Sequence, residues 1–104
     1  LIRSDFIGDF QKALEADPSL KQVFSKLGAA YHEKRELPKA VSWYMKAVAA
    51  EPENADAWLS LGYLLQDTNK KKDAVTAFRK FLELRPEADN KQEVEDQIFY
   101  LQEK

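Results

Sequence analysis

The sequence of 104 residues predicts an all-α fold, a solenoid of about six antiparallel helices. The first observation is a period of 34 residues, which separates Pro18, Pro52 and Pro86 and the similar phrases that precede them. The second is that apolar residues within each period recur at the spacing of a helix face. Successive units with the same apolar pattern bury their faces against one another, which favours a stack over a closed bundle.

Each expected helix follows from its own apolar spacing and from the residues that end it. The first is expected at residues 4 to 16 and stops before Pro18, whose nitrogen carries no N–H. A helix pair is expected at residues 21 to 50 and another at 55 to 84, with apolar residues at i, i+3, i+4 and i+7 in the first member. These stripes are Phe24, Leu27, Gly28 and Tyr31 in one pair and Trp58, Leu61, Gly62 and Leu65 in the other.

The turns and glycines inside the two pairs carry further expectations. Asn69 stands where a tight turn needs a left-handed conformation, which Asn tolerates. Arg35 stands at the equivalent place in the first pair, where mild strain is expected. Gly28 and Gly62 each cost about 1 kcal/mol relative to Ala inside a helix, which predicts that a neighbouring helix approaches closely there.

A last helix is expected at residues 90 to 103, where Val94, Ile98 and Leu101 form a narrow apolar stripe. Phe99 lies beside this stripe, and charged or amide side chains surround the rest of the helix. This arrangement predicts a polar-backed cap, because the last unit of a stack otherwise leaves its apolar face in water.

The repeated residues resemble the tetratricopeptide repeat, whose pattern is W-x2-L-G-x2-Y, then A-x3-F, then P. Residues 21 to 54 and 55 to 88 are interpreted as full repeats, and residues 1 to 20 as the second half of a preceding one. Residues 89 to 104 are the capping helix of what is then a single domain spanning 1 to 104. The resemblance implies a right-handed α-α superhelix.

Two aromatic residues depart from the family pattern. Phe6 and Phe81 are large where two helices should meet closely, which raises a question about local packing. The first helix also presents Phe6, Ile7 and Phe10 with too little to cover them. Either the sequence was trimmed from a longer repeat protein, which is favoured, or this end packs on a second copy.

The resemblance implies a non-catalytic protein-binding scaffold, because family members typically receive peptides or partner domains in a concave groove lined by the first helix of each repeat. The family's groove positions fall on Gln22, Ser25, Ala29, His32, Glu33, Asp56, Leu59, Tyr63, Gln66 and Asp67. They combine an apolar centre at Ala29, Leu59 and Tyr63 with an acidic border and no Lys or Arg. The expected partner is a neutral or basic protein segment with an apolar anchor, and Tyr63 is the expected anchor contact.

One subtype of the family is disfavoured by the residues at these positions. Chaperone-binding members use Lys and Asn to clamp the two carboxylates of an acidic C-terminal tail. Ser25, Ala29 and Ser60 occupy the positions where those residues would stand, so these positions offer no charged side chain to pair with a carboxylate. Such tails are expected to bind poorly.

Composition excludes several other classes of partner. Sixteen Lys and Arg against 18 Asp and Glu give a net charge of -2, without a long-range field that would hold nucleic acid or an anionic membrane. No cysteine is present, so a disulfide or a sulfur-ligated zinc site is excluded. No segment approaches the roughly 20 apolar residues of a membrane span, so membrane insertion is not expected. The chain is expected to be soluble, with the cytoplasm favoured but the compartment left open.

Catalytic, cofactor and metal sites are not expected either. Phosphate-cradling glycine loops are absent, and His32 lacks the second His at i+4 that a zinc-binding helix needs. Lys70, Lys71 and Lys72, followed by Asp73, are interpreted as a solvated turn. The alternative to peptide binding is a self-association module that forms a homodimer or larger homo-oligomer through the exposed faces of the terminal helices.

Overall fold

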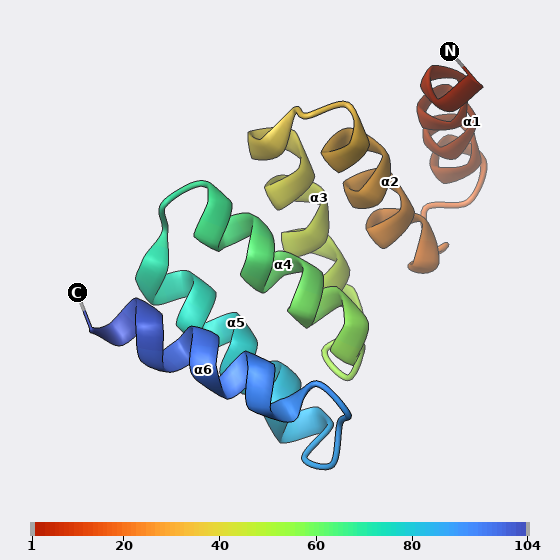
Figure 1. Ribbon diagram of the computed structural model, residues 1–104. Helices are drawn as coiled ribbons and strands as arrows, with labels where there is room; N and C mark the ends of the chain where they lie inside the picture. The colour runs from red at the N-terminus through yellow and green to blue at the C-terminus, as the bar shows by residue number, and fades with distance from the viewer. Residues whose placement is uncertain (1, 104) are drawn as a thin grey trace. The chain divides into compact units, whose positions relative to one another are not determined.

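A computed structural model describes residues 2–103 and the side chains of residues 6–103, and within that range the chain forms six α-helices and no strand (Figure 1). The helices are α1 (Ile2–Ala16), α2 (Gln22–Glu33), α3 (Leu37–Ala50), α4 (Ala55–Asp67), α5 (Lys71–Leu84) and α6 (Lys91–Gln102). The prediction of an all-α chain is thereby confirmed for these residues. The first helix begins two residues earlier than expected. The remaining helix ends agree with the expected ranges to within about one residue.

The chain divides between Pro52 and Glu53 into two compact units, α1 to α3 and α4 to α6, and each is described by itself. The division falls close to the expected end of one repeat at residue 54. That the whole chain is a single domain with the repeat boundaries given above stays a prediction.

In the first unit, α2 packs against both α1 and α3 (Figure 1). Leu27 of α2 and Ala40 of α3 are fully buried, and burial of such apolar surface is what holds short helices together. A Cβ atom added at Gly28 would lie 2.6 Å from Cδ2 of Tyr44, so the predicted close approach is confirmed. Ile7 of α1 is buried, contrary to the expectation that it lacks cover, whereas Phe6 is 46% exposed.

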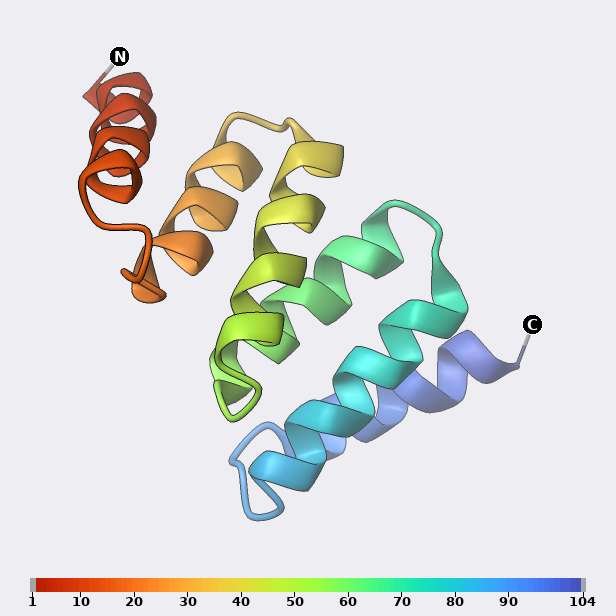
Figure 2. The ribbon, with the colours of Figure 1, turned by 180° about the vertical axis from the view of Figure 1, so that it is seen from behind.

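In the second unit, α5 packs against both α4 and α6, and Figure 2 shows it from behind, in front of α6. Phe78 is fully buried at its centre, and a Cβ atom at Gly62 would lie 2.6 Å from Cε1 of that ring. Phe81 is 2% exposed, so the core accommodates the large side chain whose packing was in question. The predicted stripe of α6 is confirmed, since Val94, Ile98 and Leu101 are buried.

The turns inside the two helix pairs have the same hydrogen bonds. Arg35 and Asn69 both have φ of 63°, the left-handed conformation expected at these two places. The Arg35 N–H donates to the His32 carbonyl and the following N–H to the Tyr31 carbonyl, and the Asn69 turn repeats this pattern. This is the Schellman motif, which satisfies the last carbonyl groups of α2 and α4 and returns the chain as an antiparallel helix.

Candidate functional site

The five predicted site residues of the first unit share one side of α2, which we call the α2 strip. Gln22, Ala29 and Glu33 are exposed, and Ser25 and His32 are half-buried. They lie on the side of the helix away from its buried stripe, as their spacing of three and four residues requires. The Ser25 hydroxyl donates to the Gln22 carbonyl oxygen at 3.3 Å, so it is already engaged within the helix.

The other five predicted residues share one side of α4, which we call the α4 strip. Asp56 and Asp67 are exposed at its ends, and Leu59, Tyr63 and Gln66 are half-buried between them. The local sequence fixes this arrangement, because the buried Leu61, Leu64 and Leu65 occupy the opposite side of the helix. Asn54 caps the helix by accepting a hydrogen bond from the Ala57 N–H at 3.1 Å.

Tyr63 is held in place by residues from both neighbouring helices. Its ring meets the edge of the Phe78 ring, with centroids 4.9 Å apart and planes inclined by 74°. Its hydroxyl donates a long hydrogen bond of 3.4 Å to Oε2 of Glu93 on α6. Partial burial, and secondarily the Glu93 carboxylate, raises the pKa of the Tyr63 hydroxyl above its ordinary value. A ring positioned in this way loses little further freedom when a ligand binds.

A third set of side chains, on α6, belongs to the same face and was not predicted from the sequence. Glu93, Gln97 and Tyr100 stand 34 positions after Leu59, Tyr63 and Gln66, and we call them the α6 strip. The hydrogen bond from Tyr63 to Glu93 places this strip beside the α4 strip. Tyr100 is 60% exposed, so the outer surface of α6 is less polar than the cap expected from sequence. The 34-residue period was the signal that could have identified these residues.

Charges and unsatisfied polar atoms complete the site. Asp56 lies 3.8 Å from Nη1 of Arg85, so a cation borders the α4 strip although none stands among the ten predicted residues. The side-chain oxygens Oε1 of Gln66 and Gln97 are buried and have no hydrogen-bond partner among the described residues. A buried acceptor without a donor carries a desolvation cost of about 1–3 kcal/mol.

Metal ligands and membrane-spanning helices are two further features that bear on function. Among the side chains of residues 6–103, no group of three or more His, Asp or Glu is placed to hold a metal ion. No helix within the same range has both the length and the apolar character that a membrane crossing requires. The arrangement offers hydrogen bonding, apolar contact and carboxylate charge on a helical surface.

Comparison with protein-family models finds two overlapping matches. A model described as TPR repeat matches residues 28–69, and one described as tetratricopeptide repeat matches residues 55–87. Together they extend from the middle of α2 through α5 and include the whole α4 strip.

Curated proteins with similar sequences are much longer than this chain. The human protein O-mannosyl-transferase TMTC2 is 33% identical over 66 residues, which are 64% of this chain and 8% of that protein. The peroxisomal targeting signal receptor of Candida albicans is 30% identical over 76 residues, 73% of this chain and 12% of the receptor. The chain therefore spans about a tenth of the length of these relatives.

Solved structures show the same fold. The crystal structure of MamA is similar with a TM-score of 0.85 and 22% identity, over 97% of this chain and 57% of MamA. The first TPR of Spaghetti (RPAP3), bound to the HSP90 peptide SRMEEVD, is similar with a TM-score of 0.83 and 21% identity, over 97% of this chain and 78% of that one.

Proposed function

Because the chain belongs to the tetratricopeptide repeat family, we propose that it is a non-catalytic scaffold that binds a peptide or a partner domain through the first helices of its repeats. Two similar proteins support protein binding as the general role. One is a receptor for a peroxisomal targeting signal, and the other is solved with a peptide of HSP90. Neither identifies the ligand of this chain.

The observation that carries the proposal is the arrangement around Tyr63. Its ring packs on Phe78 and its hydroxyl bonds to Glu93, which leaves a half-buried aromatic residue at the boundary with solvent. Next to it on the α4 strip, Leu59 is also half-buried. An apolar side chain of a peptide suits the adjacent surface of Leu59 and Tyr63.

The charge of this face favours a neutral or basic ligand. Asp67 lies at one end of the α4 strip and Glu93 on the α6 strip, while Arg85 offsets the charge of Asp56. The peptide in the Spaghetti complex is acidic, and Ser25 and Ala29 argue against that chemistry here, because neither side chain can pair with a carboxylate as a lysine does. The contribution of the α2 strip to binding is part of the proposal.

A capture experiment with matched variants tests the proposal. The chain is used as bait in a cell lysate beside the double variant Leu59→Glu/Tyr63→Ala, and captured proteins are identified by mass spectrometry. Met45→Glu/Phe99→Ala is the control, because it likewise replaces one aliphatic residue by Glu and one aromatic residue by Ala, at exposed positions outside the strips. A partner captured by the parent and the control, but lost from the strip variant, supports the proposal. Equal capture by all three baits contradicts it.

The alternative function, self-association, is favoured by one observation. Phe6 of α1 is 46% exposed and stacks obliquely on Phe10, with centroids 6.4 Å apart. If this surface joins two copies, Phe6→Ser/Phe10→Ser converts a dimer into a monomer in sedimentation velocity. A parent chain that sediments as a monomer rules this alternative out.

A further inference from the structure

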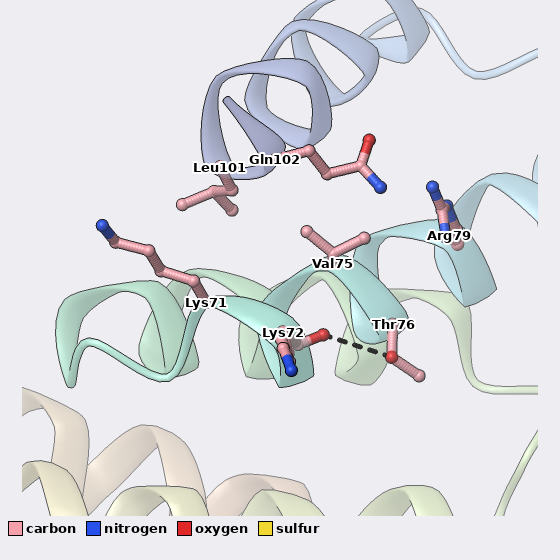
Figure 3. Close-up of a pocket in the computed structure, with 7 residues that line it drawn as sticks. All are labelled: Lys71, Lys72, Val75, Thr76, Arg79, Leu101 and Gln102. Atoms are coloured by element: carbon pink, nitrogen blue, oxygen red, sulfur yellow. Dashed lines mark hydrogen bonds between the residues drawn. The ribbon is translucent and has the colours of Figure 1, made fainter. Parts of the chain in front are cut away.

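A groove with a volume of about 680 Å³ lies between α5 and α6 in the second unit, apart from the strips (Figure 3). Figure 3 shows Leu101 and Gln102 reaching from α6 toward α5, which supplies the remaining five lining residues. The lining residues are Lys71, Lys72, Val75, Thr76, Arg79, Leu101 and Gln102. The volume is within the range of ligand-binding pockets.

The groove is positively charged around an apolar floor. Val75 and Leu101 are largely buried and form the floor, whereas Lys71, Lys72 and Arg79 are exposed. None of these three cations forms an ion pair with another described residue, and no carboxylate is among the residues that line the groove. Their charges are therefore available to a ligand.

The position of two of these lysines is unfavourable for the helix itself. Lys71 and Lys72 are the first two residues of α5, at the end of a helix where the backbone dipole favours negative charge. Lys70, which precedes them, provides no side-chain cap. The interpretation of these lysines as a solvated turn agrees with their exposure. It does not explain why lysines stand at the start of a helix, beside an apolar floor.

The groove and the strips use different sides of α6. Gln102 borders the groove and Tyr100 belongs to the α6 strip. A helix turns by about 100° per residue, so these two side chains point to nearly opposite sides. A ligand in the groove is therefore separate from the ligand of the strips.

We propose that the groove between α5 and α6 binds an acidic peptide segment of a partner protein. The carboxylates of the segment pair with Lys71, Lys72 and Arg79, and an apolar side chain of the segment covers Val75 and Leu101. The apolar floor and the presence of three cations favour a peptide over nucleic acid, which is held by the neutralisation of many phosphates. Binding at this groove does not depend on the proposed function of the strips.

Fluorescence anisotropy with synthetic probes tests this inference. The probe is a labelled amphipathic peptide of Glu, Asp and Leu, and two comparison probes are the same peptide with Lys at every acidic position and a labelled single-stranded oligonucleotide. The groove variant is Lys72→Glu/Arg79→Glu. The control is Lys21→Glu/Lys26→Glu, two lysines of the first unit, which gives the same change in net charge. Lys72→Arg/Arg79→Lys keeps both charges in the groove.

The groove variant is expected to bind the acidic peptide at least about 10-fold more weakly than the parent, and the other two variants within about twofold of the parent. Lys72→Glu puts an acidic residue in the first turn of α5, which suits the helix dipole, so circular dichroism should show an unchanged fold. Several results overturn the inference: no binding of the acidic peptide, equal weakening in groove and control variants, or tighter binding of the Lys peptide or the oligonucleotide. A parent dimer that the groove variant abolishes in sedimentation velocity also overturns it, because a second copy is then the occupant.

Discussion

Gly28 and Gly62 each lie in a helix interior, beneath the ring of a buried aromatic residue. Glycine costs about 1 kcal/mol relative to alanine in a helix, so propensity alone favours alanine at both places. The rings of Tyr44 and Phe78 oppose this, because a Cβ atom would lie 2.6 Å from each of them. Steric packing therefore outweighs helix propensity at these two residues and favours glycine, since neither ring can move without disturbing a dense core.

A set of three alanine substitutions separates packing from propensity. Gly28→Ala and Gly62→Ala are each expected to lower the free energy of unfolding by about 1–3 kcal/mol through overpacking. Gly8→Ala is the control, since nothing lies within 4 Å of the place that its Cβ atom would take, and it is expected to stabilise α1 by up to about 1 kcal/mol. Urea unfolding measures all three, and stabilisation by Gly28→Ala or Gly62→Ala would contradict the packing described here.

The pKa of the Tyr63 hydroxyl depends on the burial of this side chain and on its contact with Glu93. Its pKa lies above the ordinary value of 10.0 in the folded chain, so the folded state favours the neutral phenol. The associated stability is present below pH 10 and is lost as the pH rises through the raised pKa. Glu93→Gln is expected to lower this pKa without restoring the ordinary value, because the burial of the hydroxyl remains.

A tyrosinate absorbance titration measures this effect. The chain has four tyrosines, so a Tyr63→Phe variant identifies which part of the titration belongs to Tyr63. An identical Tyr63 titration in the parent and in Glu93→Gln would show that the contact with α6 is absent in solution.

At the scale of elements, the two Schellman turns show how one geometry accepts different residues. Both Arg35 and Asn69 have φ of 63°, a conformation that costs a residue with a side chain about 1–2 kcal/mol. Asn reduces this cost through local hydrogen bonding of its short polar side chain, which Arg lacks. The strain is therefore greater between α2 and α3 than between α4 and α5.

Glycine substitutions test the difference between the turns. Arg35→Gly is expected to raise the free energy of unfolding by about 0.5–1 kcal/mol, because relief of the strain exceeds the entropy that glycine adds to the unfolded chain. Asn69→Gly is expected to have a smaller effect. Thermal and urea unfolding of both variants provide the comparison, and a greater gain from Asn69→Gly than from Arg35→Gly would refute the ranking.

The helices could be predicted from sequence because their signals are local. Pro18, Pro52 and Pro86 end helices by their own chemistry, and apolar spacing defines each buried stripe without reference to distant residues. The side of α4 that carries the candidate site follows from the same spacing. The contact between the α4 strip and the α6 strip could not be predicted in this way. The hydrogen bond from Tyr63 to Glu93 depends on how α6 packs and on the rotamers of these two side chains.

The groove between α5 and α6 could not be predicted from the sequence for the same reason. The sequence places three consecutive lysines at a helix start, but it does not reveal that Arg79 and Leu101 border the same space. Nor does it reveal that Arg85 approaches Asp56 and changes the charge at the edge of the α4 strip. Such contacts are tertiary, so periodicity carries no information about them.

At the scale of the whole molecule, a net charge of -2 conceals surfaces of opposite sign. Within the second unit, the α4 and α6 strips carry Asp67 and Glu93, while the groove on the other side of α6 carries Lys71, Lys72 and Arg79. A small scaffold with two such surfaces is suited to hold two ligands of different charge. Selectivity then arises from like-charge repulsion as well as from attraction.

Independent binding at the two surfaces is the prediction at this scale. A ligand captured through the strips is expected to keep its affinity, within about twofold, when the acidic peptide saturates the groove, because the two use nearly opposite sides of α6. Isothermal titration calorimetry in the presence and absence of the acidic peptide measures this. Competitive displacement would show that the two ligands share one surface.

The most direct test of the central claim, that the first helices of the repeats bind the partner, is a nuclear magnetic resonance titration. The ligand identified by capture is added to isotope-labelled chain, and changes in amide chemical shift are mapped onto the sequence. We expect the largest changes at residues 22–33, 59–67 and 93–100, which carry the α2, α4 and α6 strips. Changes confined to residues 71–79 or to α1, with the α4 strip unaffected, would contradict the claim.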